Sequence, residues 1–236
     1  MAEAVIVEAV RSPVGRRNGG LSGVHPAELS AQVLNGLVGR AGVDPALVDD
    51  VIWGCVMQAG EQALDIARTA VLTAGWPETV PGVTVDRQCG SSQQSVHFAA
   101  AGLIAGQYDL VVAGGVESMS RVPMGASGQV AGSPFSASGW TGRYGEVTPH
   151  QGVGAEMVAQ QWGLSRTQLD EYSLRSHEKA AAAQQRHDGA ADIVVGDGHQ
   201  GLVAEVMGAG QFGVIQPVFA FLLGALDDVA DEPAVT

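Results

Sequence analysis

The order of apolar segments predicts an α/β fold, with a mostly parallel sheet that carries helices on both faces. Short apolar runs, typical of buried parallel strands, alternate with longer stretches in which apolar residues recur at helical spacing. Such regular alternation is typical of an open α/β sheet. After residue 116 the pattern changes, because glycine, serine and proline become frequent and apolar periodicity weakens. We therefore expect an inserted loop subdomain in that region.

Four strands are expected in the first half of the chain, each a short apolar run. They cover residues 4–7, 51–53, 83–85 and 109–113. A run at 193–195 is a candidate for a further strand. The acidic end of the chain, 227–236, is expected to be frayed and solvated.

Three helices are expected between these strands. Pro26 opens the first at the favoured first-turn position, and Gly42 ends it. Asp65 is placed to cap a second helix that runs through Ala74. The third covers 89–107, where apolar and small residues recur at helical spacing.

Two more helices are expected after the loop region. Helical spacing returns over 153–162. The last helix begins near Ser165, which together with Gln168 matches the S-x-x-Q capping box, and runs to about His187.

Composition limits the class of protein. The 236 residues are 46% apolar and 16% charged, which suits a folded chain of one or two domains. Twelve Lys and Arg against 25 Asp and Glu give a net charge of −13, which argues against nucleic acid or anionic membranes as partners. The longest apolar stretch, 212–226, is interrupted and too short for a membrane span. With no signal-peptide pattern and only two cysteines, we expect a reduced, cytoplasmic protein.

Cys89 is the candidate nucleophile. It precedes Gly90-Ser91-Ser92 at a predicted strand-to-helix junction. The unpaired N–H groups and positive dipole end of a helix favour the thiolate, which is the nucleophilic form. Gly90 lets a substrate approach the backbone closely. The alternative is that Cys89 is a small buried residue. Cys55, at the end of a predicted strand, is expected to belong to the core.

Several motifs occur in an order that resembles a known family. The run V-D-R-Q-C-G-S-S-Q-Q at 85–94 is followed by A-G-G-V-E-S-M-S at 113–120. Further matching segments lie at 8–15, 150–156, 162–166 and 174–177. Together they resemble the thiolase family over about residues 3 to 188.

The resemblance implies acyl transfer through Cys89. This residue would attack a 3-ketoacyl-CoA, release acetyl-CoA and pass the acyl group to CoA, or condense two acetyl-CoA molecules in reverse. His150 would lie beside the pantetheine of CoA. Met119 and Ser120 lie in the segment that leads into the family's CoA-binding loop domain, although core packing is an alternative for Met119 and for Met124. The CoA thioester is then a substrate, with no tightly bound cofactor and no metal, and a homodimer or homotetramer is implied.

The resemblance also divides the chain. Residues 1–116 would form the thiolase-like α/β domain, 117–188 the CoA-binding loop domain, and 189–236 a divergent tail. The second thiolase half is missing, because the family's N-E-A-F, G-H-P-x-G and C-x-G segments do not occur.

The missing half leaves two alternatives open. The chain could be a catalytically silent homologue that binds CoA or a full-length partner. In the family two similar halves pack their helix layers together, so an uncovered Cys89 helix would recruit a partner or cause aggregation. A condensing enzyme of the ketoacyl-synthase kind is a more distant possibility.

Other patterns suggest chemistry but have simpler interpretations. Residues 196–201 fit G-x-G-x-x-G, although a glycine-rich turn is favoured over a dinucleotide site. His177 and His187 are better explained as solvated helix residues than as metal ligands. The basic pair Arg16 and Arg17 suits a solvated loop or subunit contact better than a CoA-phosphate site.

Overall fold

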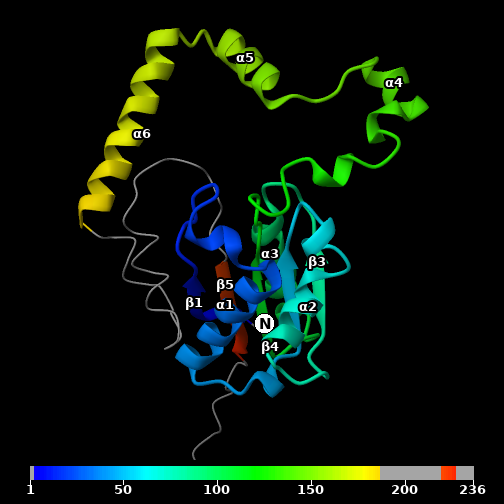
Figure 1. Ribbon diagram of the computed structural model, residues 1–236, viewed down its shortest axis with the longest axis vertical. Helices are drawn as coiled ribbons and strands as arrows, with labels where there is room; N and C mark the ends of the chain where they lie inside the picture. Colours follow the sequence, from blue (N-terminus) through cyan, green and yellow to red (C-terminus); the bar gives the residue numbers. More distant parts are fainter. Residues whose placement is uncertain (1–2, 187–218, 227–236) are drawn as a thin grey trace, which may run out of the picture. The chain divides into compact units, whose positions relative to one another are not determined.

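The computed structural model describes residues 3–186 and 219–226 (Figure 1). They form two compact units, and each is considered by itself. The first unit comprises residues 3–127 together with 219–226, and the second comprises 128–186. The predicted strand at 193–195, the G-x-G-x-x-G run at 196–201, His187 and the acidic end at 227–236 lie outside the described residues.

A mixed five-stranded sheet forms the centre of the first unit (Figure 1). Its order is β1-β5-β4-β2-β3. The strands are β1 (Glu3–Arg11), β2 (Asp50–Gly54), β3 (Gly82–Val85), β4 (Leu110–Gly115) and β5 (Phe219–Leu226). β2 pairs in parallel with β3 and β4, whereas β5 lies antiparallel between β1 and β4. Four strands therefore share one direction, which confirms the predicted α/β class.

The antiparallel strand β5 is the element that the sequence pattern did not identify. It is formed by the end of the long apolar stretch, and Ala220, Leu222 and Leu223 are buried in it. Because β5 lies between two strands, a continuous apolar run suits its position. Within the described residues, no helix has the length and apolar character needed to cross a membrane.

Alternating side chains along the strands form two separate cores. Trp53 and Val112 belong to the core under α1 (Pro26–Ala41) and α2 (Ile66–Thr73). Their neighbours Ile52 and Val111 belong to the core under α3 (Ser91–Ile104). Successive strand residues point to opposite faces, so the helices cover both faces of the sheet.

The predicted ends of the first helices are confirmed. Gly42 ends α1 in the left-handed conformation, with φ +66°. At the start of α1 the Nδ1 atom of His25 accepts a hydrogen bond from the Ala27 N–H at 3.1 Å. Asp65 caps α2, and its carboxylate also accepts a hydrogen bond from the Thr84 hydroxyl. Five short 3₁₀ turns complete the described chain: η1 (Gly20–Gly23), η2 (Pro45–Leu47), η3 (Gly60–Gln62), η4 (Ala126–Gly128) and η5 (Pro134–Ser136).

The second unit consists of α4 (Ser138–Tyr144), α5 (Gln151–Trp162) and α6 (Arg166–Arg186). The predicted capping box at the start of α6 is confirmed. Ser165 Oγ accepts a hydrogen bond from the Gln168 N–H at 3.2 Å, and Gln168 Oε1 accepts one from the Ser165 N–H at 2.8 Å.

Two glycines allow the carboxyl ends of β2 and β4 to lie against the first turn of α3. A Cβ atom on Gly54 would lie 2.4 Å from the backbone nitrogen of Ser92. One on Gly115 would lie 2.1 Å from Ser92 Oγ and 2.5 Å from the Gly54 carbonyl oxygen. Neither position can hold a side chain without moving the helix, so these glycines determine where α3 begins above the sheet.

We predict that Gly115→Ala destabilises the fold by about 1–3 kcal/mol, because the new methyl group overlaps backbone and Ser92. The measurement is urea unfolding followed by circular dichroism. Gly39→Ala is the matched control: Gly39 lies in α1, a Cβ there meets nothing within 4 Å, and alanine should stabilise a helix interior by about 0.5–1 kcal/mol. Equal stability of the two variants would contradict the packing argument.

Candidate active site

Cys89 lies in the turn between β3 and α3, immediately before Gly90, the N-cap of α3. The helix therefore begins two residues later than Cys89, and its first turn starts at Ser91. The Cys89 side chain is exposed, so the alternative that it is a buried small residue is wrong. No side chain caps the helix at Gly90, so the positive end of the helix dipole faces this turn without a competing carboxylate cap.

The turn holds Gln88, the residue before Cys89, in a strained conformation. Gln88 has φ +49°, in the left-handed region that residues other than glycine rarely adopt. The Asp86 carboxylate compensates by accepting hydrogen bonds from the Gln88 N–H at 2.7 Å and from its side-chain amide. Strain of this kind persists only where the surroundings enforce it, and it is common at functional sites.

Ser91 also stabilises this turn, through hydrogen bonds of its side chain. Its hydroxyl accepts a hydrogen bond from the Arg87 N–H at 2.9 Å and donates one to the Gln88 carbonyl at 2.6 Å. Ser91 is only 4% exposed. The next residue, Ser92, lies directly against Gly54 and Gly115. The turn that carries the exposed Cys89 thiol is therefore fixed at its helix end.

Cys55 is in a different environment, as its predicted core position implies. It is 1% exposed at the end of β2, and the buried amide of Gln62 donates to its sulfur at 3.3 Å. Burial, together with the nearby carboxylates of Glu117 and Asp86, raises the pKa of the Cys55 thiol to about 12. The Cys55 thiol therefore stays protonated at physiological pH.

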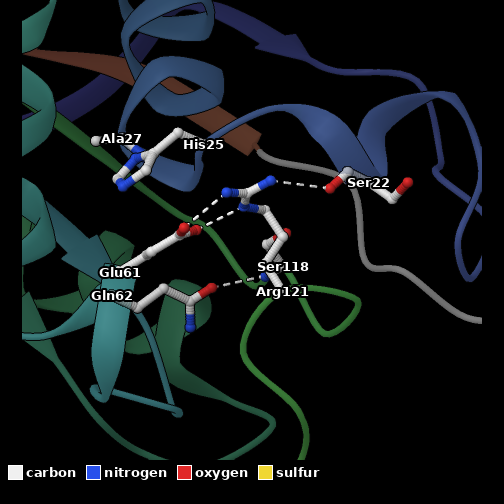
Figure 2. Close-up of polar contacts among 7 residues, drawn as sticks. All are labelled: Ser22, His25, Ala27, Glu61, Gln62, Ser118 and Arg121. Atoms are coloured by element: carbon white, nitrogen blue, oxygen red, sulfur yellow. Dashed lines mark hydrogen bonds and ion pairs between the residues drawn. The ribbon is translucent and has the colours of Figure 1, made fainter.

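Glu117 and Gln62 connect the loops that follow β4 and β2. The Glu117 carboxylate accepts hydrogen bonds from the N–H groups of Val56 and Met57, at 2.8 and 3.3 Å, and from Gln62 Nε2 at 2.9 Å. The fully buried Gln62 also accepts a hydrogen bond from the Ser118 N–H at 2.8 Å, which Figure 2 shows.

Arg121 forms a second connection to the same 3₁₀ turn. Figure 2 shows its guanidinium donating two hydrogen bonds to the Glu61 carboxylate, at 2.5 and 2.6 Å, and one to the Ser22 carbonyl at 3.2 Å. Arg121 lowers the pKa of Glu61, mainly through these hydrogen bonds. The pair is therefore intact above the usual titration range of a glutamate, and its contribution is lost as the pH falls through the lowered pKa.

Met119 and Ser120 lie between these two connections and are partly exposed. The Ser120 hydroxyl oxygen accepts a hydrogen bond from the Asn18 N–H at 3.0 Å, which ties the segment to the exposed loop of Arg16 and Arg17. Met124 is 77% exposed, so the core-packing alternative is wrong for that methionine.

His150 belongs to the second unit, where it is the N-cap of α5. Its Nδ1 atom accepts a hydrogen bond from the Gly152 N–H at 3.2 Å, so a proton on the neutral ring sits on Nε2. The ring is exposed, as is His177 on α6. In the part of the chain that the structure describes, no three His, Cys, Asp or Glu side chains converge as metal ligands do.

An exposed cysteine on a rigid turn at the carboxyl edge of an α/β sheet is an arrangement suited to covalent catalysis. The chain also matches the family model described as thiolase, N-terminal domain, over residues 4–205. It belongs to the thiolase family.

Named relatives agree with this assignment. The chain is 48% identical over 190 residues to a steroid 3-ketoacyl-CoA thiolase of Mycobacterium tuberculosis, covering 78% of this chain and 46% of the relative. It is 41% identical to a 3-ketoacyl-CoA thiolase of Saccharophagus degradans, over 84% and 49% of the two chains, and 42% identical to one of Erwinia tasmaniensis, over 84% and 50%. The chain therefore spans about half the length of these relatives.

We predict that iodoacetamide at about pH 8 modifies Cys89 and leaves Cys55 unmodified in the folded protein, because the thiolate is the reactive form and Cys55 is buried with a raised pKa. Peptide mass spectrometry measures the result. Both cysteines should react in urea, which serves as the control. Modification of Cys55 in the native protein at a rate comparable to that of Cys89 is the contrary outcome.

Proposed function

We propose that the protein is a thiolase-type acyltransferase in which Cys89 carries the acyl group. The observation that carries the proposal is the exposed Cys89 thiol on a fixed turn, within the segment that matches the family. Residues 1–116 would supply the nucleophile, residues 117–188 would bind CoA, and residues 189–236 would form a divergent tail.

The reaction follows from the chemistry of a thiolate and a 3-ketoacyl-CoA. The Cys89 thiolate attacks the C3 carbonyl carbon and forms a tetrahedral alkoxide. Collapse of the alkoxide breaks the C2–C3 bond, and the departing carbon takes a proton to give acetyl-CoA. The thiolate of a second CoA then attacks the acyl thioester on Cys89 and releases the shortened acyl-CoA and the free cysteine. Two easier steps replace one difficult step.

The residues of this chain would have separate tasks in that reaction. The N–H groups at the start of α3 face the Cys89 turn, and their dipole would stabilise negative charge on the reacting atoms. Met119, Ser120 and His150 would contact the CoA part of the substrate. His97 lies on α3, about 9 Å along the helix axis from Ser91 where the helix begins, and Cys89 lies before that start, so His97 is too far away to exchange a proton with the thiol.

We also propose a substrate class and an assembly for this chain, and the substrate class is suggested by the names of its relatives. Their names point to 3-ketoacyl-CoA substrates, and one of them to steroid-derived acyl groups. We extend the general class, an acyl-CoA with free CoA as acceptor, to this chain. A cytoplasmic location and a homodimer or homotetramer complete the proposal.

An observation on α3 favours a second candidate function, a catalytically silent homologue that associates with a partner. The fourteen residues of α3 include no charged side chain, although the chain carries a net charge of −13. Phe98 and Ile104 on this helix are 47% and 56% exposed. An uncharged surface helix with exposed apolar side chains is typical of an interaction surface.

We predict that incubation with acetyl-CoA or acetoacetyl-CoA adds one acyl group to the protein, because the Cys89 thiolate exchanges with the thioester. Intact mass spectrometry measures the adduct. Cys89→Ala should abolish it, and Cys55→Ala, which removes the buried cysteine, should leave it unchanged. Absence of an adduct in well-folded wild-type protein would refute the acyltransferase function and leave the second candidate.

If α3 is an interaction surface, we predict that the wild-type chain associates at high concentration and that Phe98→Glu weakens the association, because the introduced charges must be desolvated in the contact. Light scattering after size exclusion measures the mass. Leu47→Glu is the control, since Leu47 is an apolar side chain that is 65% exposed and belongs to η2, not to α3. A wild-type chain that remains monomeric at every concentration would contradict this use of α3.

A further inference from the structure

One side-chain arrangement near the proposed active site has no task in the reaction described above. Glu61 and Gln62 are neighbours at the end of η3, and both bind the segment that leaves β4. Gln62 accepts a hydrogen bond from the Ser118 N–H, and Glu61 forms the paired hydrogen bonds with Arg121 (Figure 2). We call Glu61, Gln62, Ser118 and Arg121 the loop clamp.

The loop clamp contacts a short turn, closed by its own hydrogen bonds, at two of its residues. The N–H groups of Arg121 and Val122 donate to the Ser118 carbonyl at 3.0 and 2.8 Å, so residues 118–122 form one compact turn. Gln62 binds the first residue of that turn, Ser118, and Glu61 binds the fourth, Arg121. Met119 and Ser120 lie between the two contacts.

The clamp is built from contacts that resist movement. Gln62 is 0% exposed, and its amide makes bonds to Met57 O and Glu117 in addition to the bond from Ser118. The Arg121–Glu61 pair is bidentate, which fixes direction as well as distance. The side chains of this pair are 27% and 36% exposed, so water screens it only in part.

From this geometry we propose that the loop clamp positions Met119 and Ser120 for acyl-CoA, so that Glu61, Gln62 and Arg121 are positioning residues for substrate binding. The proposal rests on the proposed acyltransferase function. It goes beyond that function by assigning a role to three residues whose hydrogen bonds, within the described residues, reach neither Cys89 nor its turn.

The Cys89 turn is supported by different contacts. Asp86 and Ser91 hold it from within, and Gly54 and Gly115 fix the helix behind it. None of these four residues belongs to the loop clamp. Loosening the clamp should therefore change how acyl-CoA binds while the intrinsic reactivity of the Cys89 thiol stays the same.

The test measures the rate of Cys89 acylation against acetyl-CoA concentration in wild-type protein, Arg121→Ala and Glu61→Gln. The Arg121–Glu61 pair is partly exposed, and removal of such a pair changes an equilibrium by up to about fivefold. We expect the half-saturating acetyl-CoA concentration to rise by about that factor in both variants, with the maximal acylation rate nearly unchanged. The rate of Cys89 alkylation by iodoacetamide should also stay within about twofold of wild type.

Two further variants separate positioning from general damage. Arg40→Ala removes the arginine of another ion pair, Arg40–Glu8, whose atoms are 3.3 Å apart between α1 and β1, and it should behave as wild type. The double variant Glu61→Arg/Arg121→Glu restores opposite charges and should recover part of the lost affinity, as a coupled pair does. Hydrogen exchange of residues 118–122 should accelerate in Arg121→Ala and not in Arg40→Ala.

Three results would overturn the inference. The first is that Arg121→Ala forms the adduct with the same half-saturating acetyl-CoA concentration as the wild-type protein. The second is an equal loss of acylation and iodoacetamide reactivity, which would indicate damage to the Cys89 turn. The third is unchanged hydrogen exchange in residues 118–122. If the wild-type protein forms no adduct, the proposed acyltransferase function is refuted, and with it the role of the clamp in substrate binding. The hydrogen-exchange experiment still shows whether the clamp orders residues 118–122.

Discussion

The close approach of two sheet strands to the start of α3 is the constraint on which the candidate site depends. Gly54 and Gly115 end the parallel strands β2 and β4, and neither has room for a Cβ atom beside Ser91 and Ser92. Because backbone meets backbone there, α3 can begin at only one place above the sheet. The position of α3 in turn fixes the end of the preceding turn, which carries Cys89. The hydrogen bonds of Asp86 and Ser91 then order this turn between the end of β3 and the fixed start of α3.

Features encoded by local chemistry could be predicted from the sequence. Apolar runs located β2, β3 and β4, and the first-turn Pro26, the cap Asp65 and the capping box at Ser165 located helix starts. The strand β5 could not be identified in this way, because a short apolar run is equally compatible with a strand, a helix or an interrupted hydrophobic segment. Its place between β1 and β4 is decided by pairing with strands more than a hundred residues away.

The same limit applies to the candidate site. Cys89 could be singled out as the candidate nucleophile because the cysteine and the predicted helix start are adjacent in sequence. Gln62 was not, since its partners Glu117 and Ser118 lie 55 and 56 residues further on and no spacing rule connects them. A glutamine on a polar turn ordinarily indicates solvent exposure, yet Gln62 is fully buried because its amide satisfies carbonyl, carboxylate and N–H groups together. Only the folded structure shows that compensation.

Under the proposed function, the contacts around the Cys89 turn and the loop clamp would meet two different demands of a covalent catalyst. A nucleophile must be exposed and held at a fixed angle, which here requires a left-handed Gln88 and the contacts that enforce it. A substrate-binding segment must instead be ordered without enclosing the nucleophile, and the loop clamp would meet that need for residues 118–122. Both sets of contacts join the carboxyl ends of β2 and β4, through Gly54 and Gly115 in one case and through the hydrogen bond between Gln62 and Ser118 in the other. That edge of the sheet therefore fixes both the start of α3, before which Cys89 lies, and the start of the segment that leaves β4.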